Sequence, residues 1–145
     1  MSAEPVPPTF VDTNVLVYAL AADDARRSSI AQRELRALMA EQALRTSLQV
    51  LEELYVTLTR KVKPPLSPQQ ALRYMDQVAA WPVFAPDYGA VRAAVEVAEA
   101  QGFSFWDSLI VVCAARSGAS RLFTEDLQDG RVVMGVEVVN PFRAQ

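Results

Sequence analysis

The chain has 145 residues, of which 51% are hydrophobic and 21% charged, a length and composition typical of one globular domain with a core of its own. The absence of histidine and the single cysteine exclude Ser-His-Asp and Cys-His catalytic groups, His-pair ribonucleases and zinc sites built on His or several Cys. A net charge of −3 is unlike that of domains that hold nucleic acid by bulk electrostatics. Any catalysis must therefore rest on carboxylates, hydroxyls, lysine, arginine or a metal ion held by oxygen atoms.

Strand and helix signals alternate along the chain. In chain order we expect a flexible tail at 1–8, a strand at 9–11, helices at 13–20 and 24–42, a strand at 43–47, helices at 47–61 and 67–79, an extended segment at 81–84, helices at 87–101 and 104–115, and strands at 121–124 and 136–139. The helices show apolar residues at helical spacing, and Gly102 suits a helix C-terminus. The alternation predicts an α/β fold whose parallel sheet is covered on both faces.

The N-terminal residues and the single cysteine bear on the cellular compartment of the protein. Residues 1–8 lack the basic start and apolar run of a signal peptide, and the apolar runs are too short for a transmembrane helix. Cys113 lies in the apolar run 109–115 and has no partner for an internal disulfide. A buried thiol in a cytoplasmic protein is the expectation.

Four acidic residues occupy positions suited to chemistry. Asp12 directly follows the first strand and Asp126 follows the strand at 121–124, so both belong at the edge of a parallel sheet where ligands bind. Asp107 lies at the start of an apolar helix, where an unpaired charge is costly. Glu53 lies on an amphipathic helix. We therefore ask whether the four carboxylates converge in one crevice.

Each of these acids also has a structural interpretation. Asp12 can act as a helix N-cap, Asp107 completes an S-x-x-D capping box with Ser104, Asp126 suits a turn, and Glu53 can be a solvated charge. Together, however, several carboxylates in one crevice repel one another unless a cation neutralises them. Oxygen ligands favour Mg²⁺ or Mn²⁺ over zinc, and such a site suits phosphodiester hydrolysis by an activated water.

Four segments, taken in order, resemble the motifs of PIN-domain ribonucleases, and in particular of the VapC-type toxins of bacterial toxin–antitoxin pairs. They are FVDTNVLVY at 10–18, QVLEEL at 49–54, FWDSLI at 105–110 and TEDLQDG at 124–130. The resemblance covers about residues 9–142 and implies a single PIN-like domain over that range. It implies a three-layer α/β/α sandwich with a central parallel sheet in the order 3-2-1-4-5.

The resemblance also implies an activity and its residues. The activity would be metal-dependent endoribonuclease cleavage with Mg²⁺ or Mn²⁺, in a toxin that binds a small antitoxin protein and forms a homodimer. The family acids, which would hold the metal and act in catalysis, correspond to Asp12, Glu53, Asp107 and Asp126. Asp12 and Asp107 would be the most direct ligands. Residues that would orient the acids, or join them as an occasional fifth, correspond to Thr13, Asn14, Thr124 and Asp129.

Three alternatives stay open on the residues alone. Helical periodicity does not choose between Glu52 and Glu53, and only the family motif favours Glu53. Arg60, Lys61 and Lys63 form either an RNA-binding patch or an ordinary solvated helix end. A PIN-like fold can also be a catalytically inactive binding or scaffold module. A phosphatase is disfavoured because the sequence has neither a D-x-D motif at Asp12 nor a Gly-rich phosphate loop.

Overall fold

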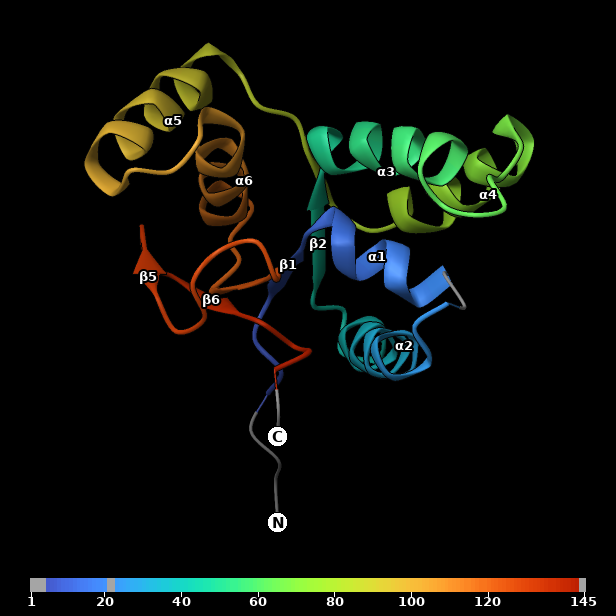
Figure 1. Ribbon diagram of the computed structural model, residues 1–145. Coiled ribbons are helices and arrows are strands. Elements are labelled where there is room, and N and C mark those ends of the chain that lie inside the picture. Colours follow the sequence, from blue (N-terminus) through green and yellow to red (C-terminus); the bar gives the residue numbers. More distant parts are fainter. Residues whose placement is uncertain (1–4, 21–22, 144–145) are drawn as a thin grey trace.

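Figure 1 shows the computed structural model of the chain, which describes residues 5–20 and 23–143. The elements in chain order are β1 (Thr9–Val11), α1 (Thr13–Leu20), α2 (Ala25–Ala40), β2 (Leu44–Ser47), α3 (Leu48–Arg60), α4 (Pro68–Ala79), β3 (Val83–Phe84), α5 (Tyr88–Gln101), α6 (Phe105–Arg116), β4 (Arg121–Phe123), β5 (Val132–Val133) and β6 (Val136–Val139). Every helix and strand expected from the sequence is found at or close to its predicted position.

The strands form one sheet in the order β3-β2-β1-β4-β6-β5. Neighbouring strands from β3 to β6 run parallel, whereas β5 pairs antiparallel with β6. The order 3-2-1-4-5 is therefore confirmed for the parallel strands, with β6 as the fifth. The edge strand β5 was not predicted. A turn at Met134 and Gly135, with φ of 54° and 76°, joins it to β6, and such turns are usually signalled by Asn-Gly or Asp-Gly instead.

Helices cover both faces of the sheet, as expected. In Figure 1, α1 to α4 lie on one side of β1 and β2, and α5 and α6 lie on the other. The helices pack in pairs, α1 with α2, α3 with α4, and α5 with α6. The fold is thus an α/β/α sandwich. No helix within the described residues is long and apolar enough to cross a membrane.

The core is centred on β1, β2, β4 and α6. Phe10, Leu44 and Leu122, one from each of these three strands, are fully buried. Residues 108–114 of α6 are all buried, which explains why that helix is apolar around its whole circumference. Cys113 is among them, and burial raises the pKa of its thiol to about 11. The expectation of a buried, unpaired thiol is confirmed.

Residues 1–4 of the predicted N-terminal tail lie outside the described residues. The following segment, 5–8, contacts the fold. The Pro8 carbonyl accepts a hydrogen bond from the Ser120 N–H (2.9 Å), and Val6 packs against the core. The limits of a single domain at residues 9 and 142 stay a prediction.

The face of α3 that packs on the core can be tested with two substitutions on that helix. Leu54 is fully buried, whereas Val56 is 48% exposed. We expect Leu54→Ala to lower the free energy of unfolding by about 2–5 kcal/mol, because it removes core contacts and leaves a cavity. Val56→Ala should change it by less than about 0.5 kcal/mol. Urea unfolding of both variants measures these values, and equal effects would contradict the assigned face.

Candidate active site

The candidate site lies at the C-terminal ends of β1 and β4. These strands pair in parallel, with Val11 opposite Phe123, so the residues that follow them emerge side by side. Asp12 follows β1, and Thr124 and Asp126 follow β4. The Asp12 N–H donates to the Phe123 carbonyl (3.0 Å), and the Thr124 hydroxyl donates to Asp12 Oδ2 (2.9 Å). Backbone pairing therefore brings residues more than a hundred positions apart into one edge of the sheet.

Asp12 is a buried carboxylate, with only 6% of the residue exposed. Its Oδ1 accepts a hydrogen bond from the Thr13 N–H (2.8 Å) and its Oδ2 accepts the bond from Thr124. The side chain thus bonds the residue directly after it instead of the second or third helical N–H that an N-cap would accept. Burial raises the pKa of Asp12 from its ordinary 3.8 to about 7. The two hydrogen bonds lower it and the charges of Asp126 and Glu53 raise it further.

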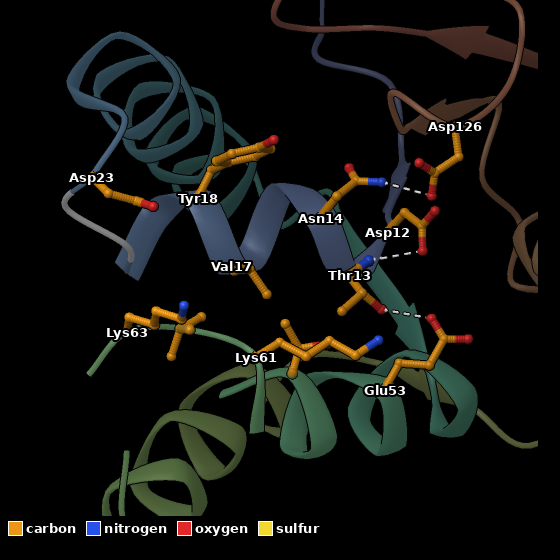
Figure 2. Close-up of a pocket in the computed structure, with 12 residues that line it drawn as sticks. Asp12, Thr13, Asn14, Val17, Tyr18, Asp23, Glu53, Lys61, Lys63 and Asp126 are labelled. Atoms are coloured by element: carbon orange, nitrogen blue, oxygen red, sulfur yellow. Dashed lines mark hydrogen bonds between the residues drawn. The ribbon is translucent and has the colours of Figure 1, made fainter. Parts of the chain in front are cut away.

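Glu53 reaches the same region from α3. Its Oε2 accepts a hydrogen bond from the Thr13 hydroxyl (3.1 Å), shown in Figure 2, and its Oε1 accepts one from Gln49 Nε2 (2.8 Å). Thr13 therefore connects the two acids, through its N–H to Asp12 and through its hydroxyl to Glu53. The hollow that contains Asp12 is lined by Glu53 and not by Glu52. The structure thus places Glu53, and not Glu52, in the hollow with Asp12, a distinction that helical periodicity could not make.

Asp126 is held in place by Asn14. The Asn14 amide donates to Asp126 Oδ2 (3.0 Å; Figure 2) and to the Thr124 hydroxyl (3.3 Å). The same hydroxyl accepts a bond from the Asp126 N–H (3.1 Å). Partial burial raises the pKa of Asp126, the Asn14 bond lowers it, and the charges of Asp107 and Glu125 raise it. The predicted orienting residues Thr13, Asn14 and Thr124 all contact the acids.

The other two predicted acids are placed differently. Asp107 lies in the first turn of α6, close enough to Asp126 to raise the pKa of that carboxyl, but it does not line the hollow around Asp12. Ser104 caps α6 through the Asp107 N–H (3.1 Å). Asp129 turns away from the site, because its carboxylate accepts a bond from the Asn140 N–H (2.7 Å) and pairs with Arg143 (3.4 Å). The structure does not bring Asp129 to the other acids.

A hollow of about 500 Å³ is lined by four acids, Asp23 among them, and by two lysines. Asp12, Glu53 and Asp126 line it together with Lys61 and Lys63. Figure 2 shows the Lys61 side chain extending along α3 toward Glu53. Arg60, the third member of the basic patch considered from the sequence, is not among the lining residues. The hollow therefore offers negative and positive groups to the same ligand.

Two further residues, Tyr18 and Gln49, shape this site and were not predicted from the sequence. Tyr18 lines the hollow one helical turn after Asn14, and its hydroxyl donates to Glu125 Oε1 (2.7 Å). Arg27 of α2 pairs with the other oxygen of Glu125 (3.2 Å). Gln49, four residues before Glu53 and so on the same helix face, fixes that carboxylate. The i, i+4 spacing from a candidate site residue was the available signal for both Tyr18 and Gln49.

The donor set fits a hard divalent cation. The groups at this edge are carboxylates, hydroxyls and an amide, the oxygen donors that Mg²⁺ and Mn²⁺ prefer. The Asn14 Oδ1 is buried and has no hydrogen-bond partner among the described residues. Within the described part of the chain, no three acids approach closely enough to form a complete metal cluster. Asp12, Glu53 and Asp126 line one open hollow. A cation there would offset the burial of the Asp12 carboxylate, the main cause of its raised pKa, and the smaller repulsion from Asp126 and Glu53.

Comparisons with known proteins agree with this architecture. The PIN domain family model matches residues 9–131. A solved structure of Mycobacterium tuberculosis VapC20, described as a sarcin–ricin loop cleaving toxin, is 22% identical with a TM-score of 0.59, over 81% of this chain and 89% of that chain. A toxin–antitoxin complex from Klebsiella pneumoniae is 19% identical with a TM-score of 0.64, over 92% and 97%. No curated protein sequence matches. The family match covers most of the chain, and the chain belongs to the PIN domain family.

Proposed function

We propose that this protein is a metal-dependent endoribonuclease and the toxin of a toxin–antitoxin pair. The observation that carries the proposal is the meeting of Asp12, Glu53 and Asp126 in one hollow at the C-terminal edge of β1 and β4. The match to the PIN domain family supports it. So does the fold shared with a toxin that cleaves the sarcin–ricin loop and with a toxin–antitoxin complex.

The acids would hold the cation, with Asp12 at the centre and Glu53, Asp126 and Asp107 around it. When bound, Mg²⁺ or Mn²⁺ would polarise the phosphate and lower the pKa of the attacking water. Thr13 and Thr124 hold the Asp12 carboxylate with two hydrogen bonds of 2.8 and 2.9 Å, which fixes the direction of its oxygens.

Positive charge for the substrate would come from two lysines of the same hollow. Lys61 and Lys63 line it, and a lysine ammonium attracts phosphate as a point charge. Such a local patch would give RNA phosphates a weak attraction in a chain with a net charge of −3. We further propose that the protein binds a small antitoxin protein and forms a homodimer.

The proposed activity depends on metal and on Asp12. We expect the purified protein to cut members of a panel of labelled single-stranded and hairpin RNAs with Mg²⁺ or Mn²⁺, and not with EDTA. Asp12→Asn and Asp107→Asn should each lower the rate more than about 100-fold, because each removes a proposed ligand. Asp76→Asn, the same change at an exposed position on α4, should cut normally. Folded protein that binds RNA or a small protein without cleaving would favour a scaffold module.

The two neighbouring glutamates should differ in their effect. Glu53 is bonded to Thr13 and Gln49 in the hollow with Asp12, whereas Glu52, which is exposed like Glu53, does not line that hollow. We expect Glu53→Gln to lower the cleavage rate at least about tenfold and Glu52→Gln to leave it near the wild-type rate. The two rates under the same metal conditions provide the test, and a larger loss in Glu52→Gln would assign the site to the wrong glutamate.

The buried Asp12 should make metal-free protein less stable as pH rises. Its pKa is about 7 in the folded protein and 3.8 ordinarily, so between these values the folded state holds a proton that the unfolded state has lost. With EDTA present, the free energy of unfolding of the wild type, relative to Asp12→Asn, should fall as pH rises from 3.8 to about 7. Adding Mn²⁺ at higher pH should restore the free energy of unfolding of the wild type but not that of Asp12→Asn. If the free energy of unfolding changes with pH in the same way for the wild type and Asp12→Asn, the pKa of Asp12 is not raised in the folded protein.

A further inference from the structure

A second hollow lies by the start of α3, where Gln49 lines it, whereas Lys61 follows the end of that helix. It has a volume of about 410 Å³, and its lining includes Gln49, Glu52, Glu53, Pro86 and Trp106. Glu53 lines both this hollow and the one that contains Asp12. The two hollows therefore share one carboxylate of the candidate site. A ligand bound at Glu53 could contact residues of both hollows.

Trp106 is an exposed aromatic residue in a place where a helix normally turns its large apolar side chains inward. It is 63% exposed, although it precedes Asp107 in the first turn of the buried helix α6. Its ring contacts Phe105 edge-to-face, with ring centres 5.0 Å apart. Gln49 Nε2 donates to both the Trp106 carbonyl (3.3 Å) and Glu53 (2.8 Å). The Trp106 backbone is thus held next to Glu53 by Gln49, while much of the indole surface stays open.

The charges around the two hollows differ. Among the described residues that line the hollow beside Trp106, none is positively charged, and Glu52 and Glu53 are acidic. A phosphate is repelled there, whereas a neutral aromatic ring is not. The hollow that contains Asp12 is also rich in acids, with four, but it has two positive groups, Lys61 and Lys63. A strand crossing Glu53 would therefore place its phosphates toward the lysines and a base toward Trp106.

We propose that Trp106 is a stacking platform for an unpaired nucleobase of the RNA substrate, next to the bond that is cut. This inference rests on the proposed nuclease function and adds to it a residue that contacts the substrate. The base must be unpaired, since a base inside a duplex is already stacked and cannot lie on the indole. Trp106 acts here as a specificity-determining residue that binds substrate and takes no part in bond cleavage.

Two measurements test the platform. In cleavage assays, Trp106→Ala should raise KM for a single-stranded RNA that the wild type cuts by about 5- to 150-fold, the range of base–aromatic stacking, with a smaller change in kcat. Trp106→Phe keeps an aromatic ring and should recover most of the loss. Leu72→Ala, which removes an exposed apolar side chain on α4 (51% exposed), should have the wild-type KM. An unchanged KM in Trp106→Ala overturns the inference while leaving the nuclease proposal intact.

Binding without cleavage gives the second measurement. The chain has two tryptophans, so the Trp81→Phe variant in an Asp12→Asn background reports Trp106 fluorescence alone. A short single-stranded RNA of mixed sequence should quench this emission saturably, and a duplex of the same sequence should quench it far less. This readout stands even if the wild type cuts nothing, in which case the nuclease proposal alone fails. Saturable RNA binding without quenching overturns the stacking role of Trp106. Light scattering adds a second check: if Trp106→Ala has a changed oligomeric state and an unchanged KM, the stacking role is also overturned. The indole would then belong to an interface between copies of the chain.

Discussion

Parallel pairing of β1 with β4 is the constraint on which the candidate site depends. The register that sets Val11 opposite Phe123 places Asp12 where the Thr124 hydroxyl reaches it at 2.9 Å. Two residues from distant parts of the chain then share one buried edge, and α1 begins there with Thr13 bonded to both Asp12 and Glu53. A slip of one residue between these strands would turn every following side chain to the opposite face. The positions of the site residues are therefore fixed by the register of the sheet.

The acids around this edge fall into two electrostatic groups. Glu125 is paired with Arg27 and bonded to Tyr18, and Asp129 is paired with Arg143. Asp12, Glu53 and Asp126 form no ion pair with a described lysine or arginine and are held by hydroxyls, amides and backbone N–H groups instead. Hydrogen bonds fix the direction of these carboxylates without cancelling their charge. That charge stays available to a cation from outside the chain.

Much of this arrangement could be predicted from the sequence, but for different reasons. The strand, acid and helix order around Asp12 and Asp126 follows from residue patterns, whereas the sheet order came from the family resemblance. Periodicity could not separate Glu53 from Glu52, because the choice depends on Thr13 and Gln49, one of them on another helix. The family resemblance gave Asp129 as an occasional fifth acid. Its carboxylate bonds Asn140 and pairs with Arg143, which follow the predicted strand at 136–139, and no local pattern reveals these long-range contacts. Trp106 was missed since an aromatic residue in an apolar helix is normally part of the core.

The exposure of Trp106 also bears on how an acidic protein can hold RNA. Nonspecific binding to nucleic acid draws most of its strength from neutralised phosphates, and here the described hollow offers two lysines beside four acids. Those lysines cannot supply a large electrostatic attraction against a net charge of −3. Stacking on an indole does not depend on charge, and it discriminates strongly against paired bases. A site that combines weak phosphate attraction with one aromatic contact would thus select unpaired RNA by its shape and release it readily after cleavage.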